Sequence, residues 1–251
     1  MESSQMKLQV IAAAAALAIA GTAGAAINPG SDMGQGGELI LSVWDDASST
    51  SYTLDLGIDM RNFDENQTYV FDLDDPMWTD FSVGAAGDMT WDVVGSDRAA
   101  GMPSVNGIMT TARFGTDGSV TGLQHAGYNT LQSNIEQYAQ ALNGLNSDYA
   151  TNNSYFLSGG SYAGDTGTWG SFAGNVTFAT ASYGETMEFW SLTTGVIEGR
   201  RPSPTAEHTK LAGTWTLADN QLVYTAVPVP AAVWLLGSSL IGLVGVARRR
   251  K

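Results

Sequence analysis

Short runs in which apolar and polar residues alternate fill most of the chain between residues 38 and 225. In Ser51–Gly57, for example, Tyr52, Leu54 and Leu56 occupy every second position. Successive side chains of a strand point to opposite faces, so this period predicts strands with one buried face. The predicted strands are Glu38–Trp44, Ser51–Gly57, Thr68–Leu73, Thr79–Val83, Asp88–Gly95, Gly107–Phe114, Val120–Leu123, Ser154–Leu157, Ser171–Thr180, Thr186–Leu192, Gly213–Leu217 and Gln221–Thr225.

Turn-forming residues separate these runs. The chain has 30 glycines, many of them between the predicted strands, and Asp219-Asn220 predicts a terminal hairpin. Many short strands without alternating helices favour an all-β fold over a βαβ fold. The sequence therefore predicts a mainly β domain, a β-sandwich for which a jelly-roll-like arrangement is one form.

One segment has helical spacing instead. Leu131, Ile135, Tyr138, Leu142 and Leu145 lie at i, i+4, i+7, i+11 and i+14, which places them on one face of a helix. Ser133 with Glu136 forms one predicted capping box, and Asn129 or Thr130 is the other predicted cap. We expect about 14 residues of amphipathic helix, ending near Gly144, inserted between strands and packed on the sheet.

The N-terminal 25 residues have the pattern of a secretory signal peptide. Lys7 precedes the apolar run Leu8–Ala20, and Ala23-Gly24-Ala25 supplies small residues at the cleavage site. We therefore predict a signal peptide over residues 1–25, cut after Ala25, and a β-rich exported domain over residues 26–226.

The C-terminal 25 residues, 227–251, form three consecutive parts. Val227-Pro228-Val229-Pro230-Ala231 is followed by an uncharged span over residues 231–247 and then by a basic tail, Arg248, Arg249, Arg250 and Lys251. Seventeen residues of helix reach about 25 Å, the short end of a membrane span. Terminal cations are typical of a cytoplasmic end, so the tail predicts a transmembrane helix that stops transfer.

This tail resembles the PEP-CTERM class of bacterial sorting signals, in the variant with a VPLPA signature. Val227–Ala231 matches that signature with Val229 in place of Leu. The resemblance implies processing by an exosortase, a membrane-embedded cysteine transpeptidase, in a Gram-negative bacterium that makes extracellular polysaccharide. It covers about a tenth of the chain and implies no activity for the domain between the two signals.

The composition of that domain limits the classes of partner that it can bind. The predicted signals contain one of the chain's 25 acids (Glu2) and five of its 11 bases (Lys7 and the basic tail), so 24 acids and 6 bases remain and the formal charge is −18. A nucleic-acid partner is not expected, because a phosphate backbone requires a basic face. The chain has no cysteine, which excludes disulfides and thiolate chemistry.

Catalytic patterns are weak. Ser161 lies in Gly159-Gly160-Ser161-Tyr162-Ala163-Gly164. The last glycine of this segment comes one residue too late for the G-x-S-x-G pattern of a nucleophile elbow. Glu185 and Glu188 are three residues apart, so a regular strand would direct them to opposite faces rather than to one sugar. We therefore predict no enzyme, with a polysaccharide-modifying activity as the less favoured alternative.

Two kinds of binding residue remain. Asp72, Asp74 and Asp75 form an acidic run before Pro76, and oxygen ligands on a turn suit calcium; a solvated acidic turn is the alternative. Trp78 and Trp169 lie near loop residues and are the predicted exposed platforms for stacking on sugar rings, whereas Trp91 and Trp190 are predicted core residues.

The sequence thus predicts an exported cell-surface or extracellular-matrix protein that an exosortase-like membrane enzyme processes. It would be held transiently in the inner membrane by one C-terminal helix, in contact with exopolysaccharide of a biofilm. The alternative is a carbohydrate-binding module with loops organised by calcium.

Overall fold

The computed structural model describes residues 26–30, 36–98, 107–123, 125–146, 150–151, 153–169, 179–193, 196–197, 201–202 and 207–226. The predicted signal peptide with Ala23 and Ala25, the sorting signature Val227–Ala231 and the basic tail lie outside these residues. So does most of the predicted strand Ser171–Thr180.

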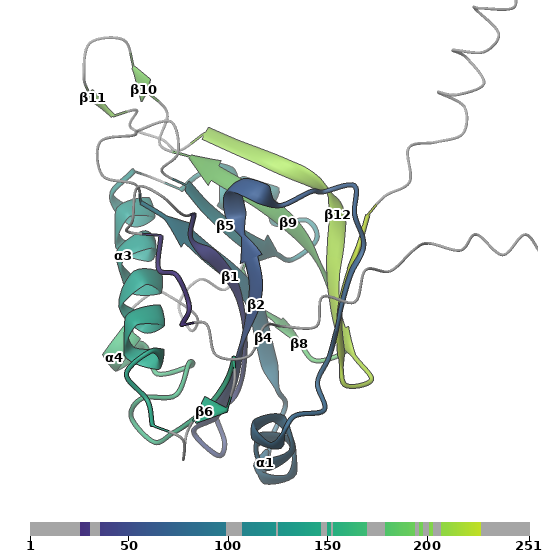
Figure 1. Ribbon diagram of the computed structural model, residues 1–251. Coiled ribbons are helices and arrows are strands. Elements are labelled where there is room, and N and C mark those ends of the chain that lie inside the picture. Colours follow the sequence, from purple (N-terminus) through teal and green to yellow (C-terminus); the bar gives the residue numbers. More distant parts are fainter. Residues whose placement is uncertain are drawn as a thin grey trace, which may run out of the picture.

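Eleven strands form one continuous antiparallel sheet (Figure 1), which confirms the predicted mainly β class. Their order is β3-β13-β12-β9-β5-β4-β1-β2-β7-β6, and β8 also pairs with β4. The strands are β1 Glu38–Asp45, β2 Thr50–Asp59, β3 Tyr69–Asp72, β4 Thr90–Asp97, β5 Gly107–Ala112, β6 Ala150–Thr151, β7 Ser154–Ser158, β8 Ala181–Ser182, β9 Thr186–Thr193, β12 Glu207–Ala218 and β13 Gln221–Thr225; β10 Val196–Ile197 and β11 Arg201–Pro202 form a separate pair.

The sheet curls, and its concave face encloses the larger apolar core. The first strands of the curl, β3, β13 and β12, lie across this core from β1 and β2 (Figure 1). Alternate residues of each strand enter it, among them Leu41 of β1, Phe189 of β9 and Trp215 of β12. The nine-residue helix α1, Pro76–Gly84, closes one end with Met77, Trp78 and Phe81.

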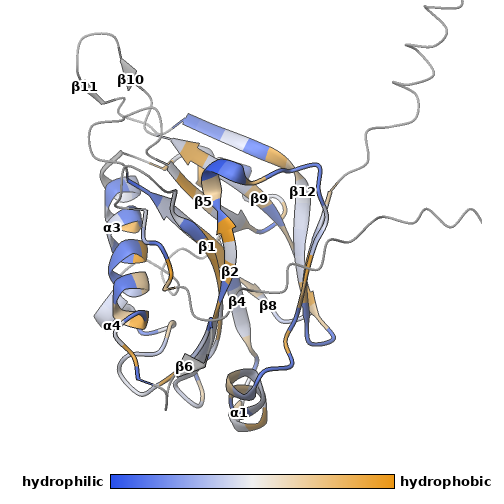
Figure 2. Cartoon of the chain, in the orientation of Figure 1, coloured by the Kyte–Doolittle hydropathy of each residue, from blue (hydrophilic) through white to orange (hydrophobic). Residues whose placement is uncertain are grey.

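The convex face is covered by the long helix α3, His125–Leu142 (Figure 1). Its apolar side, with Leu131, Ile135, Tyr138 and Leu142, packs on Ile40 and other residues that alternate with those of the first core. In Figure 2 the hydrophobic residues of α3 face the sheet and the hydrophilic ones face outward, as the spacing predicts. Both faces of β1 are therefore buried.

The helix begins earlier than predicted. It starts at His125, so the predicted caps Asn129, Thr130 and Ser133 are all inside it, and those predictions are wrong. It ends at Leu142, two residues before Gly144, close to the predicted stop. Tyr128 is fully buried against the second core, so tertiary packing supports the additional N-terminal turn.

Two predicted strands are helices. Thr79–Val83 lies within α1, because Asp75 caps the helix and Pro76 occupies its first turn, where a missing N–H costs nothing. Val120–Leu123 overlaps the short helix α2, Asp117–Thr121. The remaining helical pieces are the 3-10 turn η1, Met60–Asn62, and α4, Thr166–Trp169.

The terminal hairpin is confirmed. β12 and β13 pair up to Ala218 and Gln221, and the two connecting residues, Asp219 and Asn220, both have positive φ, 52° and 59°. That conformation is typical of a type I′ turn, which Asn and Asp tolerate better than other non-glycine residues.

Candidate functional site

The acidic run predicted to hold calcium has a structural role at Asp75. Its Oδ1 accepts hydrogen bonds from the N–H groups of Met77 and Trp78 and from the Ser154 hydroxyl, at 2.9, 3.1 and 2.9 Å. Its Oδ2 accepts from the hydroxyl of buried Tyr52 at 2.7 Å. Both oxygens of Asp75 therefore cap α1 and tie it to the sheet, and its predicted role as a metal ligand stays a prediction.

Asp72 and Asp74 are exposed. Asp72 Oδ1 accepts a hydrogen bond from the side-chain amide of Gln221 on the neighbouring strand β13, at 2.6 Å. Among the described residues no three acidic or histidine side chains gather in a group able to hold a metal ion. Calcium binding by this run stays a prediction that the fold does not test.

The two predicted glycan platforms differ in exposure. Trp78 is only 3 % exposed: its ring packs on Tyr52 with centroids 5.2 Å apart, and its Nε1–H donates to Asn220 Oδ1. The prediction of an exposed platform at Trp78 is wrong, because α1 turns this residue into the core. Trp169 is half-buried against Tyr138 of α3, with its Nε1–H bonded to the Ser161 carbonyl.

The residues weighed for catalysis do not converge. Glu188 is buried and is neutralised by Lys210, whose Nζ lies 2.5 Å from its Oε1. Glu185 is exposed in the turn before β9, and its Oε2 accepts the backbone N–H of Ser182. Ser161 lies in an exposed turn after β7.

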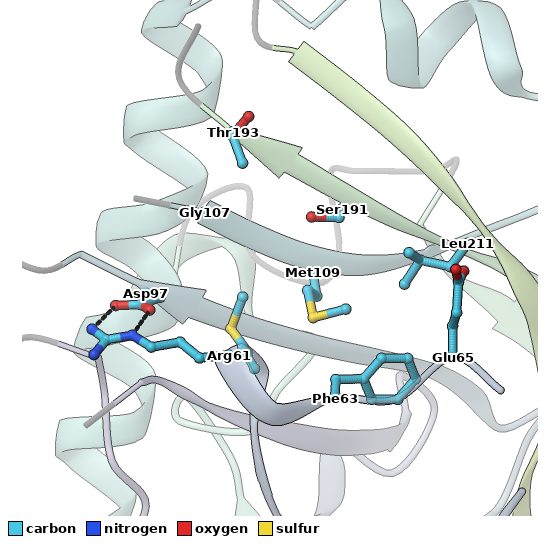
Figure 3. A pocket seen from close by; sticks show the side chains of 10 residues that line it. Arg61, Phe63, Glu65, Asp97, Gly107, Met109, Ser191, Thr193 and Leu211 are labelled. Carbon is cyan, nitrogen blue, oxygen red and sulfur yellow. Dashed lines mark hydrogen bonds and ion pairs between the residues drawn. The ribbon is translucent and has the colours of Figure 1, made fainter. Parts of the chain in front are cut away.

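A cavity of about 310 Å³ lies between η1 and the strands β5, β9 and β12 (Figure 3). Its apolar wall consists of Met60, Phe63, Met109 and Leu211. Its polar lining comes from the neighbouring strand ends and loops: Arg61, Glu65, Asp97, Gly107, Ser191 and Thr193. This volume is at the lower limit of small-molecule sites, and the lining is mainly apolar with a few polar groups.

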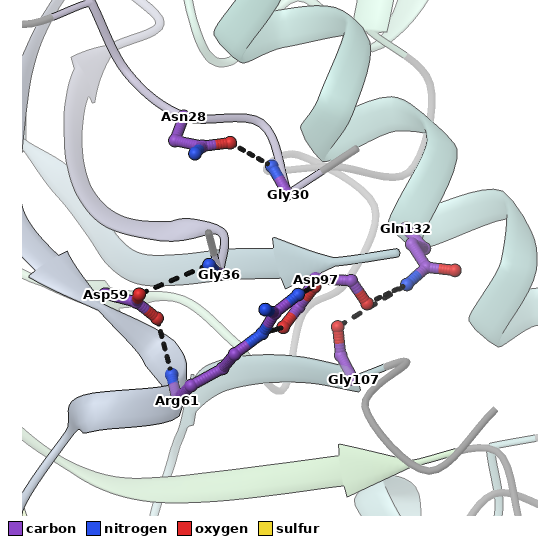
Figure 4. A network of polar contacts seen from close by, with 8 residues as sticks. All are labelled: Asn28, Gly30, Gly36, Asp59, Arg61, Asp97, Gly107 and Gln132. Atoms are coloured by element: carbon purple, nitrogen blue, oxygen red, sulfur yellow. Dashed lines mark hydrogen bonds and ion pairs between the residues drawn. The ribbon is translucent and has the colours of Figure 1, made fainter. Parts of the chain in front are cut away.

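One side of this cavity is held by a polar network (Figure 4). Arg61 donates from Nε and Nη2 to the two oxygens of Asp97, at 2.6 and 3.0 Å, which is a bidentate ion pair. Gln132 of α3 donates from Nε2 to the carbonyl oxygens of Asp97 and Gly107, at 3.0 and 3.5 Å. The cavity wall is therefore fixed to the helix on the opposite face of the sheet, and Arg61 is directed at Asp97 rather than at a ligand.

A second hollow, of about 420 Å³, is lined by Arg113, Phe114, Ala181, Glu185 and Thr186. The predicted strand Gly107–Phe114 stops at Ala112, which places Phe114 in the turn before Gly115, whose φ is +78°. The Phe114 ring is 59 % exposed. Sequence reasoning missed this site because Phe114 continues the apolar pattern of β5; the cluster Gly115-Thr116-Asp117 after it was the available turn signal.

A carboxyl group is buried under α3. Asp92 of β4 is fully buried, and neither of its oxygens has a hydrogen-bond partner. Its neighbours in the sheet include Ser42 of β1, and Ser42 in turn is paired with Thr53 of β2. The Thr53 hydroxyl lies 2.7 Å from the hydroxyl of Tyr138. Burial raises the pKa of Asp92 well above its usual value and so favours the protonated form.

In comparisons with known proteins, no family model, no curated protein and no solved structure matches this chain. Within the described part of the chain, no helix has the length and apolar character needed to cross a membrane, and the predicted span over residues 231–247 lies outside it.

Proposed function

We propose that the chain is an exported cell-surface or extracellular-matrix protein and the substrate of an exosortase-type membrane enzyme. The observation that carries this proposal is the sorting tail, Val227–Lys251. The placement of the folded unit supports it: the last strand, β13, ends at Thr225, two residues before the signature begins.

The other end of the folded unit fits the same proposal. Ile27, two residues after the predicted cleavage site, is 2 % exposed. Its backbone N–H donates to Asn143 Oδ1, and its carbonyl oxygen accepts from Asn143 Nδ2, both at 2.9 Å. The described part of the fold thus begins just after one predicted signal and ends just before the other.

In this proposal the domain has no catalytic activity of its own. The protein crosses the inner membrane of a Gram-negative bacterium, is held there by its C-terminal helix until it is processed, and then reaches the cell surface or the matrix. Its partners are the processing enzyme, the membrane before processing, and exopolysaccharide. A polysaccharide-modifying activity is the least favoured alternative, and product sizing after incubation with the exopolysaccharide would detect it.

Replacing both Pro228 and Pro230 by Ala is expected to leave the protein uncut and in the membrane fraction. Each proline fixes its own φ and biases the residue before it toward extended backbone, the form that a protease binds. Mass spectrometry identifies the mature C-terminus of the variant in a strain that has the processing enzyme. The parent protein in a strain without the enzyme is the control. The same mature C-terminus in variant and parent would contradict the proposal.

A second function, carbohydrate binding, is supported by the hollow beside Phe114. An exposed aromatic ring offers an apolar face to a sugar, while Arg113, Glu185 and Thr186 offer hydrogen-bonding groups around it. Calcium-organised loops belong to the same alternative. Curled β folds bind ligands inside the curl or on its surface. Within the mainly β class, we propose a jelly-roll-like sandwich as the arrangement.

Glycan-array binding tests the second function. The full chain is expected to bind sugars that Phe114→Ala binds about fivefold or more weakly, because stacking on an aromatic face contributes about 1 kcal/mol or more. Val83→Ala is the matched control, since Val83 is the other large hydrophobic residue that is exposed among the residues that the structure describes, 83 % exposed and located on α1. Trp169→Ala tests the remaining predicted platform. Equal binding by the parent and Phe114→Ala would remove this hollow from the proposal.

A further inference from the structure

We propose that the hollow beside Phe114 binds an acidic sugar, whose ring stacks on Phe114 and whose carboxylate pairs with Arg113. This inference rests on the carbohydrate-binding function proposed above and specifies the class of sugar. The basic side chains of this acidic domain differ in the partners that they have.

The other basic side chains that the structure describes are engaged by carboxylates. Arg61 pairs with Asp97, Arg98 with Glu136 at 3.5 Å, and Lys210 with Glu188. In contrast, no carboxylate within the described residues forms an ion pair with Arg113, although the domain carries a formal charge of −18. An arginine left unpaired among so many acids is available for a carboxylate from outside.

The guanidinium of Arg113 is also oriented. Its Nε donates to the backbone carbonyl of Thr180, just before β8, while the residue as a whole stays exposed. Holding Nε leaves the two terminal nitrogens, the paired donors that match the oxygens of a carboxylate, for a ligand. Phe114 follows directly in the sequence and lines the same hollow, so charge and apolar face are presented together.

Glu185 limits how much negative charge the ligand can carry. It lines the hollow, and its Oε2 is held by the N–H of Ser182. A neutral sugar would use this carboxylate as a hydroxyl acceptor, whereas an acidic sugar is repelled by it. The negative domain also opposes a long polyanion. The ligand that fits is therefore a single acidic residue within a mostly neutral glycan.

The test compares cellobiouronic acid with cellobiose, two disaccharides that differ in one carboxylate, by calorimetry with the full chain. We expect the acidic disaccharide to bind about tenfold tighter or better, and Arg113→Ala to remove that preference. Arg113→Lys should retain part of it, since a point charge replaces a bidentate donor. Glu185→Gln should tighten the acidic ligand, while Val83→Ala should change nothing.

The outcomes separate this inference from the function on which it rests. Equal affinity for both disaccharides, or weaker acidic binding in Glu185→Gln, would overturn the acidic-sugar inference while leaving carbohydrate binding in place. Absence of binding by both, together with an empty glycan array, would overturn carbohydrate binding itself. Thermal unfolding of each variant, unchanged from the parent, ensures that a lost preference does not reflect a lost fold.

Discussion

Replacing Asp92 by Asn is expected to raise the free energy of unfolding at pH 7 by about 2 kcal/mol, or roughly 4–8 °C in Tm. The Asp92 carboxyl is fully buried without a hydrogen-bond partner, and burial raises its pKa well above the usual value. Burial therefore favours the protonated form in the folded protein, whereas the carboxyl group ionises at about pH 4 in the unfolded chain. The Asn side chain has nearly the same shape as that of Asp and does not ionise.

The same group makes the stability depend on pH. Above about pH 4 the folded state binds one more proton at Asp92 than the unfolded state, so stability falls as pH rises, by up to ~1.4 kcal/mol per unit. Asp55 acts in the same direction, because burial and then the nearby Glu38 raise its pKa to about 7. The parent should therefore be more stable at pH 5 than at pH 8, and Asp92→Asn should have a shallower slope.

Denaturant unfolding between pH 5 and pH 8 makes this measurement. Asp74→Asn is the control for the net charge, since Asp74 is exposed and its substitution removes a negative charge from the folded domain, whereas replacing a protonated Asp92 does not. A gain that came only from reducing the negative charge of the domain would therefore be larger in Asp74→Asn than in Asp92→Asn. A loss of stability in Asp92→Asn at pH 7, or parallel pH profiles for parent and variant, would show that the Asp92 carboxyl finds a partner in solution.

Replacing Asp75 by Ala is expected to cost about 2–4 kcal/mol of unfolding free energy, with or without calcium. The loss of an N-cap costs ~1 kcal/mol, and a buried hydroxyl left without its partner costs ~1–3 kcal/mol. The hydroxyl in question belongs to Tyr52, which is fully buried and donates to Asp75 Oδ2. One carboxylate thus supports both α1 and the sheet.

Three companion variants identify the cause. Asp75→Asn keeps an acceptor for the cap and should lose less than Asp75→Ala. Asp72→Ala and Asp74→Ala change exposed residues and should stay within about 0.5 kcal/mol of the parent. Unfolding is followed by guanidinium titration in calcium and in a chelator. If Asp75→Ala were destabilised only in calcium, the result would support the predicted metal-ligand role of Asp75 and contradict the capping role.

The strands were predictable because their signal is local. In β1, Leu39, Leu41 and Val43 alternate with Ile40 and Trp44, and the structure places these two sets in the two different cores. The Asp219-Asn220 turn and the α3 spacing are equally local, since turn dihedrals and a 3.6-residue period follow from neighbours in the sequence.

The failures occurred where a short segment satisfies two patterns. Thr79–Val83 has strand-like composition, but Asp75 and Pro76 start a helix before it, and that helix buries Trp78. The same change buries a predicted sugar platform, Trp78, and gives a predicted calcium ligand, Asp75, a capping role. A capping contact that also includes Tyr52 and Ser154 depends on strands far along the chain, so no local window contains it.

By itself, the sequence determined most of the strand positions, the amphipathic helix and the acidic character, and it carries the two predicted terminal signals from which export and sorting are proposed. These depend on periodicity, charge and order, which are properties of neighbouring residues. The tertiary structure decided which faces are buried, which acids cap or pair, and that Phe114 stays in solvent beside Arg113, which has no ion pair with any described carboxylate. Those outcomes depend on how one sheet curls, because curling brings residues together that are distant along the chain.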